Sequence, residues 1–241
     1  IHDFYRRFYH PSNAILSVSG DIPSQEVFRL AEKWFGSIED HKYEIRPIPQ
    51  EPEQKEARRE VVERDVPATN ITIAFHMGDR LSKEFFLGDI TSDLLAGGDS
   101  ARLYDRLIKQ RSLFATVNAY ISGDVDEGMF IFTCQLLPTT SEDEAEQAIW
   151  KEIEDLQRGN ISDYELEKVK NKFEANTLFG ELNVMNKAMN LGYYSMIGDL
   201  SLINREVDIY RSLSKDDIAR FSQNIFRKEN SSTLIYRAKK R

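Results

Sequence analysis

Four histidines are the first residues to test for chemistry, because a metal site needs two or three donors at a fixed spacing. They are His2, His10, His41 and His76. No two of them are four residues apart, and the sequence contains neither H-E-x-x-H nor H-x-x-E-H. We expect His10, in a turn, and His41, in a linker, to be solvated, and His76, at a strand end, to be structural. The sequence therefore assigns no metal ligand.

Nucleophilic and phosphate-binding sites also lack their signatures. No G-x-S-x-G sequence is present, and the only cysteine, Cys134, lies in the β-patterned run GMFIFTCQLLP with no histidine nearby. We interpret Cys134 as a small core residue, since one thiol cannot form an internal disulfide. The run AGGDSAR has neither the glycine spacing nor the lysine of a phosphate loop, and is read as a turn between helices. We assign no catalytic residue, and the substrate-binding residues are unknown at this stage.

Clustered acidic and aromatic side chains have simpler explanations than function. The runs 142–144 and 216–217 are acidic and stand at expected helix N-termini, where negative charge meets the positive end of the helix dipole. Phe179, Tyr193 and Tyr194 could line a groove, but burial between helices is the favoured interpretation.

Composition limits the class of protein. The chain has 241 residues, 41% of them hydrophobic and 30% charged, which is enough apolar content for a real core. A net charge of −8 opposes binding to nucleic acid or to an anionic membrane. No apolar run reaches the roughly 18 residues that a membrane span needs, and no leader-like segment opens the sequence. The single cysteine and the acidic charge suit the cytoplasm, although an export signal would be missed if the chain were a piece of a longer protein.

Hydrophobic periodicity then gives the order of elements. We expect α+β architecture with an antiparallel-rich mixed sheet and helices packed on one face. The sequence predicts strands from Glu60, around Ile73, and over 14–19, 114–121, 129–137 and 232–237. It predicts one helix that ends near Tyr9, one with Ser24 as its N-cap, one that Ser100 opens, and others over 85–95, 141–159, 162–196 with a break after Thr177, 202–213 and 215–226. Ser141 and Ser162 fit capping boxes, and Ser214 is expected to cap the last of these helices. The first two strands after the linker are expected to be adjacent and antiparallel.

The domain organisation follows from a linker and an internal echo. Residues 41–57 contain three prolines among alternating charges, which is linker composition. The closing run IARFSQNIFRKENSSTLIYR repeats the order of FYRRFYHPSNAILSVSG near the start: amphipathic helix, short polar turn with asparagine, then strand. We therefore expect residues 1–40 to be the tail of a preceding homologous domain and 58–241 to be a complete second copy. Chance similarity is the alternative.

Three strings carry a resemblance to a known family. FYRRFYHPSNAILSVSGDI, LLAGGDSARLYDRLIKQRSLFATVNAYISG and ISDYELEKVKNKFEANTLF occur in this order and span nearly the whole chain. In order and spacing they resemble the pitrilysin/insulinase family, which includes the mitochondrial processing peptidases and the core subunits of the respiratory bc1 complex. The resemblance implies tandem α+β domains that enclose a chamber, within one chain or within a homo- or heterodimer.

The same resemblance also implies where the chemistry lies. Active members hold zinc in the first domain through two histidines of H-x-x-E-H and a later glutamate, and the zinc activates a water molecule. This chain starts after those positions, so zinc is expected only in a missing N-terminal domain of the parent protein. An arginine and a tyrosine of the family contact the substrate from the second domain; the matching positions here are Ile108 and Ala115. Neither side chain can hydrogen-bond a peptide.

Three hypotheses follow. The leading one is a chamber-forming C-terminal domain of a zinc-dependent metalloendopeptidase that hydrolyses unstructured peptides, inactive by itself. The alternative is a non-catalytic scaffold or partner subunit of the same family, motivated by Ile108 and Ala115. A self-standing enzyme with an unfamiliar site is the third.

Overall fold

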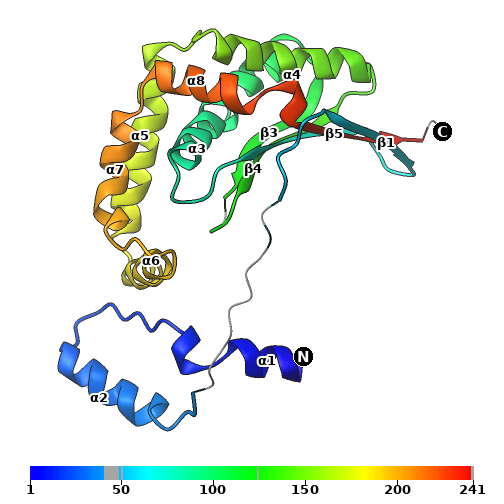
Figure 1. Cartoon of the computed structure of the whole chain (residues 1–241). Coiled ribbons are helices and arrows are strands. Elements are labelled where there is room, and N and C mark those ends of the chain that lie inside the picture. The colour runs from blue at the N-terminus through cyan, green and yellow to red at the C-terminus, as the bar shows by residue number, and fades with distance from the viewer. Residues whose placement is uncertain (41–48, 50, 124, 240–241) are drawn as a thin grey trace. The chain divides into compact units, whose positions relative to one another are not determined.

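The computed structural model describes residues 1–40, 49, 51–123 and 125–239. The chain divides into two compact units (Figure 1). Unit 1 comprises Ile1–Pro52 and Ala175–Glu206, and unit 2 comprises Glu53–Glu174 and Val207–Arg241. Among the described residues, no helix is both long enough and apolar enough to cross a membrane.

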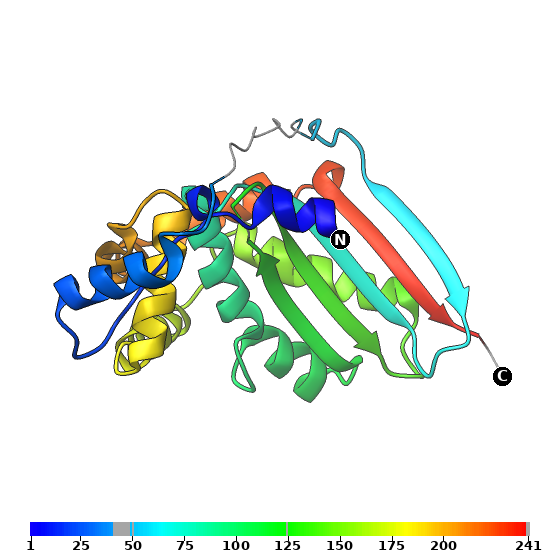
Figure 2. The same ribbon diagram turned by 90° about the horizontal axis from the view of Figure 1, so that it is seen from below.

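Five strands of unit 2 form one mixed sheet in the order β1-β5-β2-β4-β3 (Figure 2). The β2–β4, β3–β4 and β2–β5 pairs are antiparallel, and the β1–β5 pair is parallel. This confirms the expected α+β fold with an antiparallel-rich sheet. The strands are β1 (Arg58–Arg64), β2 (Asn70–Met77), β3 (Phe114–Ser122), β4 (Gly128–Leu136) and β5 (Ser231–Ala238).

Helices of unit 2 cover one face of this sheet (Figure 1). The helices α3, α4 and α8 pack against this face. The π-helix η2 comes directly before β3 in the chain. The helical elements among the described residues of both units are α1 (His2–Phe8), η1 (Pro11–Asn13), α2 (Ser24–Phe35), α3 (Lys83–Ala96), η2 (Tyr104–Gln110), α4 (Glu142–Gln157), α5 (Asp163–Gly180), α6 (Val184–Met196), α7 (Leu202–Ser212), α8 (Lys215–Ile225) and η3 (Lys228–Asn230).

The core lies between the sheet and α3, α4 and α8. Alternate residues of the strands point into it because side chains on a strand alternate between faces. Phe75 is fully buried and meets Trp150 and Phe226 edge-on, with ring centroids 5.7 and 5.1 Å apart. The strand residues that alternate with this apolar layer therefore lie on the opposite face of the sheet, away from the helices.

Helix starts follow the predicted capping chemistry at three serines. Ser141 accepts a hydrogen bond from the Glu144 N–H, which is one of the two bonds of the capping box expected there. Ser162 exchanges bonds with Glu165 in both directions. Ser214 forms a full capping box with the third residue of α8. Each cap satisfies N–H groups that the first helical turn leaves without partners.

Two other helix starts were predicted at the wrong residue. α2 begins at Ser24 itself, and Pro23 with its extended backbone is the N-cap. Ser100 does not cap the next helix, whose first helical residue is Arg102, because the chain continues directly into the wider π-helix. Helix boundaries inferred from single residues commonly shift by one or two positions.

Two strand predictions are wrong. β1 and β2 are not adjacent, because the C-terminal strand β5 inserts between them and pairs with β1 in parallel. Residues 14–19 are extended but form no strand within the described chain, since no neighbouring strand supplies backbone partners there. A period-two pattern predicts that a segment is extended, and it carries no information about its partner.

Candidate functional site

The sheet has a face that the helices of unit 2 leave uncovered, called the open face below. On β2, β4 and β3 it carries hydroxyl, amide, aromatic and aliphatic side chains, with one histidine and no Asp, Glu, Lys or Arg. Their chain neighbours on β2, Ile71, Ile73 and Phe75, are fully buried on the helix side. The open-face residues are Asn70, Thr72, Ala74 and His76 on β2, Thr116, Asn118, Tyr120 and Ser122 on β3, and Met129, Ile131, Thr133 and Gln135 on β4.

Strand register brings the polar members of the open face into rows. Thr72 pairs with Thr133, which pairs in turn with Asn118. Such neutral groups can donate and accept hydrogen bonds without selecting for one sign of charge. The open face can therefore contact a polypeptide of varied sequence, but it offers no general acid or base other than His76.

The two positions singled out by resemblance lie at one end of this sheet. Ile108 is half-buried on η2, and Ala115 is exposed at a β-bulge where the β3–β4 register shifts. The turn between them contains Ser112 in the left-handed region, at φ 50°. Bulges and π-helices often mark functional sites. Here the backbone irregularities are present, but the side chains at both positions lack hydrogen-bonding groups.

Two arginines anchor the helical turn that leads to Ile108. The Arg102 side chain is fully buried and makes a two-pronged contact with Glu165, at 3.0 and 3.1 Å. Arg106 Nη1 lies 2.8 Å from Glu152 and 3.0 Å from Asp155. Burial raises the pKa of the Glu152 carboxyl despite these arginines. Because both arginines already bind carboxylates of neighbouring helices, we interpret them as structural residues.

The structure describes three of the four histidines. His2 lies in α1 and His76 on the open face, and His41 lies outside the described residues. The expectation that His10 is solvated is wrong: it is 5% exposed, and its Nδ1 lies 2.9 Å from the Ser12 hydroxyl and 3.1 Å from Asp40. The described residues contain no group of three His, Cys, Asp or Glu side chains that could hold a metal ion.

The exposure of the cysteine and of the clustered aromatic residues tests the remaining expectations from the sequence. Cys134 is 1% exposed on the helix side of β4, and burial raises the pKa of its thiol to about 12, which makes it a core residue as predicted. Tyr194 is buried as expected, whereas Phe179 is 73% exposed, contrary to the prediction. Phe179 lies in the last turn of α5, beyond the part of that helix that packs in unit 2.

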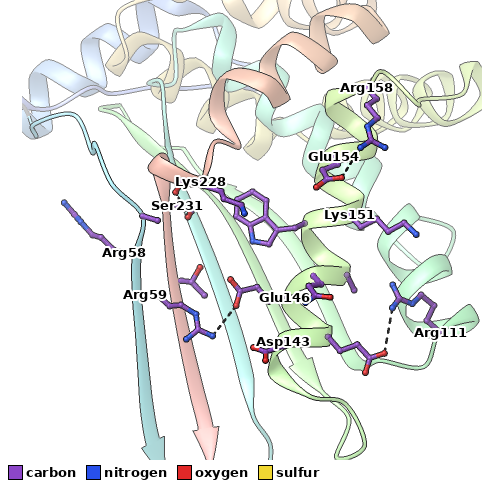
Figure 3. A pocket seen from close by; sticks show the side chains of 16 residues that line it. Arg58, Arg59, Arg111, Asp143, Glu146, Lys151, Glu154, Arg158, Lys228 and Ser231 are labelled. Atoms are coloured by element: carbon purple, nitrogen blue, oxygen red, sulfur yellow. Dashed lines mark hydrogen bonds and ion pairs between the residues drawn. The ribbon is translucent and has the colours of Figure 1, made fainter.

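A second feature of unit 2 was not anticipated from the sequence. A groove of about 790 Å³ runs along the helix-bearing side between α4 and the β1–β5 edge of the sheet (Figure 3). We call it the charged groove. No local signal marks it, because its residues come from four separate stretches of chain. Its charged and aromatic lining consists of Arg58, Arg59, Arg111, Asp143, Glu144, Glu146, Trp150, Lys151, Glu154, Arg158 and Lys228.

The fold places the chain in a class of α+β domains with a mixed sheet and helices on one face. The chain belongs to the peptidase M16 inactive domain family, whose model matches residues 1–173. The family description states that this domain is not the active one, and the sequence accordingly lacks the zinc-binding motif of active domains.

Individual relatives agree with this assignment. The chain is 27% identical over 238 residues to the zinc protease PqqE of Helicobacter pylori, covering 98% of this chain and 54% of the relative. It is similar to the crystal structure of a protease from Helicobacter pylori, with a TM-score of 0.91 and 26% identity over 98% of this chain and 58% of that one. A peptidase M16 inactive domain from Pseudomonas fluorescens shares the fold, with a TM-score of 0.78 and 15% identity over 92% of this chain and 52% of that one. The chain thus spans about half the length of these relatives.

Proposed function

We propose that this chain is the chamber-forming, non-catalytic half of a longer zinc-dependent endopeptidase and acts only beside a homologous, zinc-bearing domain. The observation that carries the proposal is a structural repeat at the two ends of the chain. α1, η1 and residues 14–19 occur in the same order as α8, η3 and β5: a helix, a three-residue 3-10 helix and then a further segment.

The repeat extends to a hydrogen bond. The Asn13 side chain donates to the Phe8 carbonyl, five residues earlier, at 2.8 Å. The Asn230 side chain donates to the Ile225 carbonyl, also five residues earlier, at 2.9 Å. In both copies the asparagine ends a three-residue 3-10 helix and an extended segment follows. A shared bond of this kind supports common descent of the two segments over chance.

The copies differ in what surrounds them. β5 pairs with a strand on each side, and α8 buries Ile218, Phe221 and Ile225. The described part of α1 has no buried residue, and Ile15, Leu16 and Val18 are 47 to 58% exposed. A cluster of exposed apolar residues indicates a surface that another protein element covers. We propose that residues 1–40 complete a preceding homologous domain, joined by the 41–57 linker to the complete domain 58–241.

The proposed activity is hydrolysis of unstructured peptides by the whole protein. Its support is the similarity to a zinc protease and the neutral open face, which can contact peptides of varied sequence. Zinc would be held by the homologous domain and would activate the attacking water there. The partners proposed are that domain, peptide substrates and a second subunit; the cytoplasm is proposed as the compartment.

A scaffold role is the second candidate, favoured by the hydrophobic side chains at Ile108 and Ala115. To separate the two, the upstream half encoded by the parent gene is produced separately, then mixed with this chain and with mixed unstructured peptides. The endopeptidase proposal predicts a complex of the halves and hydrolysis by the mixture only. A complex without hydrolysis, or an upstream half without H-x-x-E-H, supports the scaffold role. Hydrolysis by this chain alone contradicts both.

A further inference from the structure

The charged groove contains more cationic than anionic side chains, although the whole chain carries a charge of −8. Three of its cations are already paired: Arg59 with Glu146 at 3.3 Å, Arg158 with Glu154 at 3.2 Å, and Arg111 with Glu144 at 3.9 Å. Within the described chain, Arg58, Lys151 and Lys228 make no ion pair. Arg58 points away from the groove, but Lys151 and Lys228 can bind added carboxylates without first breaking an ion pair (Figure 3).

Trp150 provides an apolar surface in the same groove. Its ring is half-buried and packs edge-on against Phe75, at 5.7 Å between centroids, and the Lys228 ammonium lies 6.0 Å from the indole centroid (Figure 3). A fixed, partly exposed tryptophan among cations is a common feature of surfaces that bind other proteins.

The groove is bordered by a free strand edge. β1 is the last strand of the sheet and pairs only with β5 within the described residues. An edge strand presents backbone N–H and C=O groups that an extended polypeptide can pair with. β1, with the sequence RREVVER, carries three arginines and two glutamates, and these charges oppose self-association but permit a partner whose charges are complementary.

These features select one class of ligand. Four carboxylates lie among the cations of the groove, and they would repel a densely charged polyanion such as a nucleic acid. A polypeptide spaces its charges along a strand and carries the backbone groups that the β1 edge can pair with. We propose that the charged groove and the β1 edge bind an extended acidic segment of a partner polypeptide. This surface is on the helix-bearing side of the sheet, so the proposal does not depend on the endopeptidase role of the open face.

Tryptophan fluorescence gives a direct test, because the chain has only two tryptophans. In a Trp34→Phe background Trp150 is the single reporter. A blocked peptide as long as β1, alternating glutamate and threonine, is titrated into the chain, and the same peptide with lysine in place of glutamate is the comparison. The expected result is a saturable fluorescence change with the acidic peptide only, which weakens as salt is raised.

Charge reversal localises the binding. The double variant Lys151→Glu with Lys228→Glu should bind the acidic peptide with an affinity lower by about tenfold or more, equivalent to about 1.4 kcal/mol. Lys33→Glu with Lys187→Glu makes the same change in net charge on exposed residues of unit 1, outside the groove and β1, and should leave affinity within about twofold. Circular dichroism melting confirms that each variant is folded. The proposal would be overturned if both double variants lost the same affinity for the acidic peptide, or if the parent chain did not bind that peptide. Binding of a single-stranded oligonucleotide as tightly as the acidic peptide would also overturn it.

Discussion

At the scale of single residues, burial decides which reactive groups are available for chemistry. Cys134 illustrates this: its thiol is the only one in the chain, and its position on the helix side of β4 leaves it 1% exposed. The sequence predicted this, because a cysteine within a β-patterned apolar run has few other places to go. His10 was misjudged, because its partner Asp40 is 30 residues away and no local pattern reports such a contact.

Cys134 should not react with thiol reagents in the folded protein at neutral pH. Burial raises its thiol pKa to about 12, so the reactive thiolate is scarce and the reagent has no access. Labelling with an aromatic disulfide reagent, followed spectrophotometrically, should be complete in urea and negligible in buffer over the same period. Cys134→Ala gives the blank. Rapid labelling of the native chain would show that the core around β4 opens readily.

Asp217 should make the folded state sensitive to acid. Its hydrogen bonds to Lys83 of α3, at 2.8 Å, and to Ser214 hold the pKa of this carboxyl well below its ordinary value. A lowered folded-state pKa stabilises the fold above the unfolded pKa of about 3.9, and this stabilisation is lost as the pH falls through the folded-state value. Asp217→Asn should therefore melt below the parent chain at pH 6, with the difference narrowing towards pH 3.

The matched control for that experiment is Asp216→Asn, one residue earlier in the same helical turn. Asp216 is exposed and has no ion pair within the described residues, so its removal should change melting little at either pH. If both variants followed the same curve, the effect would belong to the dipole of α8 and not to the contacts of Asp217.

At the scale of elements, the repeat between the two ends of the chain is the main support for the proposed domain organisation. The sequence suggested it through a repeated order of elements at low identity, and the matching hydrogen bonds of Asn13 and Asn230 add a physical basis. The two asparagines differ in burial. Asn230 is 7% exposed and also donates to the His76 carbonyl at 2.9 Å, whereas Asn13 is exposed.

Asn230→Ala should lower the free energy of unfolding by roughly 1 to 3 kcal/mol, because it leaves buried carbonyls without their donor. Asn13→Ala, the matched change in the other copy, should cost less than about 0.5 kcal/mol in this chain. Urea unfolding followed by circular dichroism measures both. Equal costs would mean that the two segments are packed alike, against the proposal that the first belongs to an incomplete domain.

Most elements could be predicted because hydrophobic period and capping serines are local signals, as for Ser162 and Ser214. Strand partners could not be, because pairing is decided by residues distant in sequence; Arg58 meets Ser232 in the parallel β1–β5 pair. The π-helical winding at 104–110 also has no known short signature. The absence of a polar group at Ile108 could be read from the sequence because it is a property of one residue. The charged groove could not be predicted, because it joins residues that are distant in sequence.

At the scale of the whole molecule, the account joins a neutral open face, a first segment with exposed apolar residues and membership of an inactive-domain family. None of these requires chemistry within the chain. Together they support a division of labour in which this half shapes the chamber and another half supplies zinc. The charged groove, on the opposite side of the sheet, remains free for a partner in that arrangement.

Zinc stoichiometry tests the central claim most directly. The protein encoded by the complete parent gene and this chain alone are purified without added chelator, and their bound metal is measured by mass spectrometry together with hydrolysis of unstructured peptides. The account predicts about one zinc per complete protein, with hydrolysis, and neither zinc nor hydrolysis for this chain. Stoichiometric zinc with peptide turnover in this chain alone, or a complete protein without zinc, would contradict it.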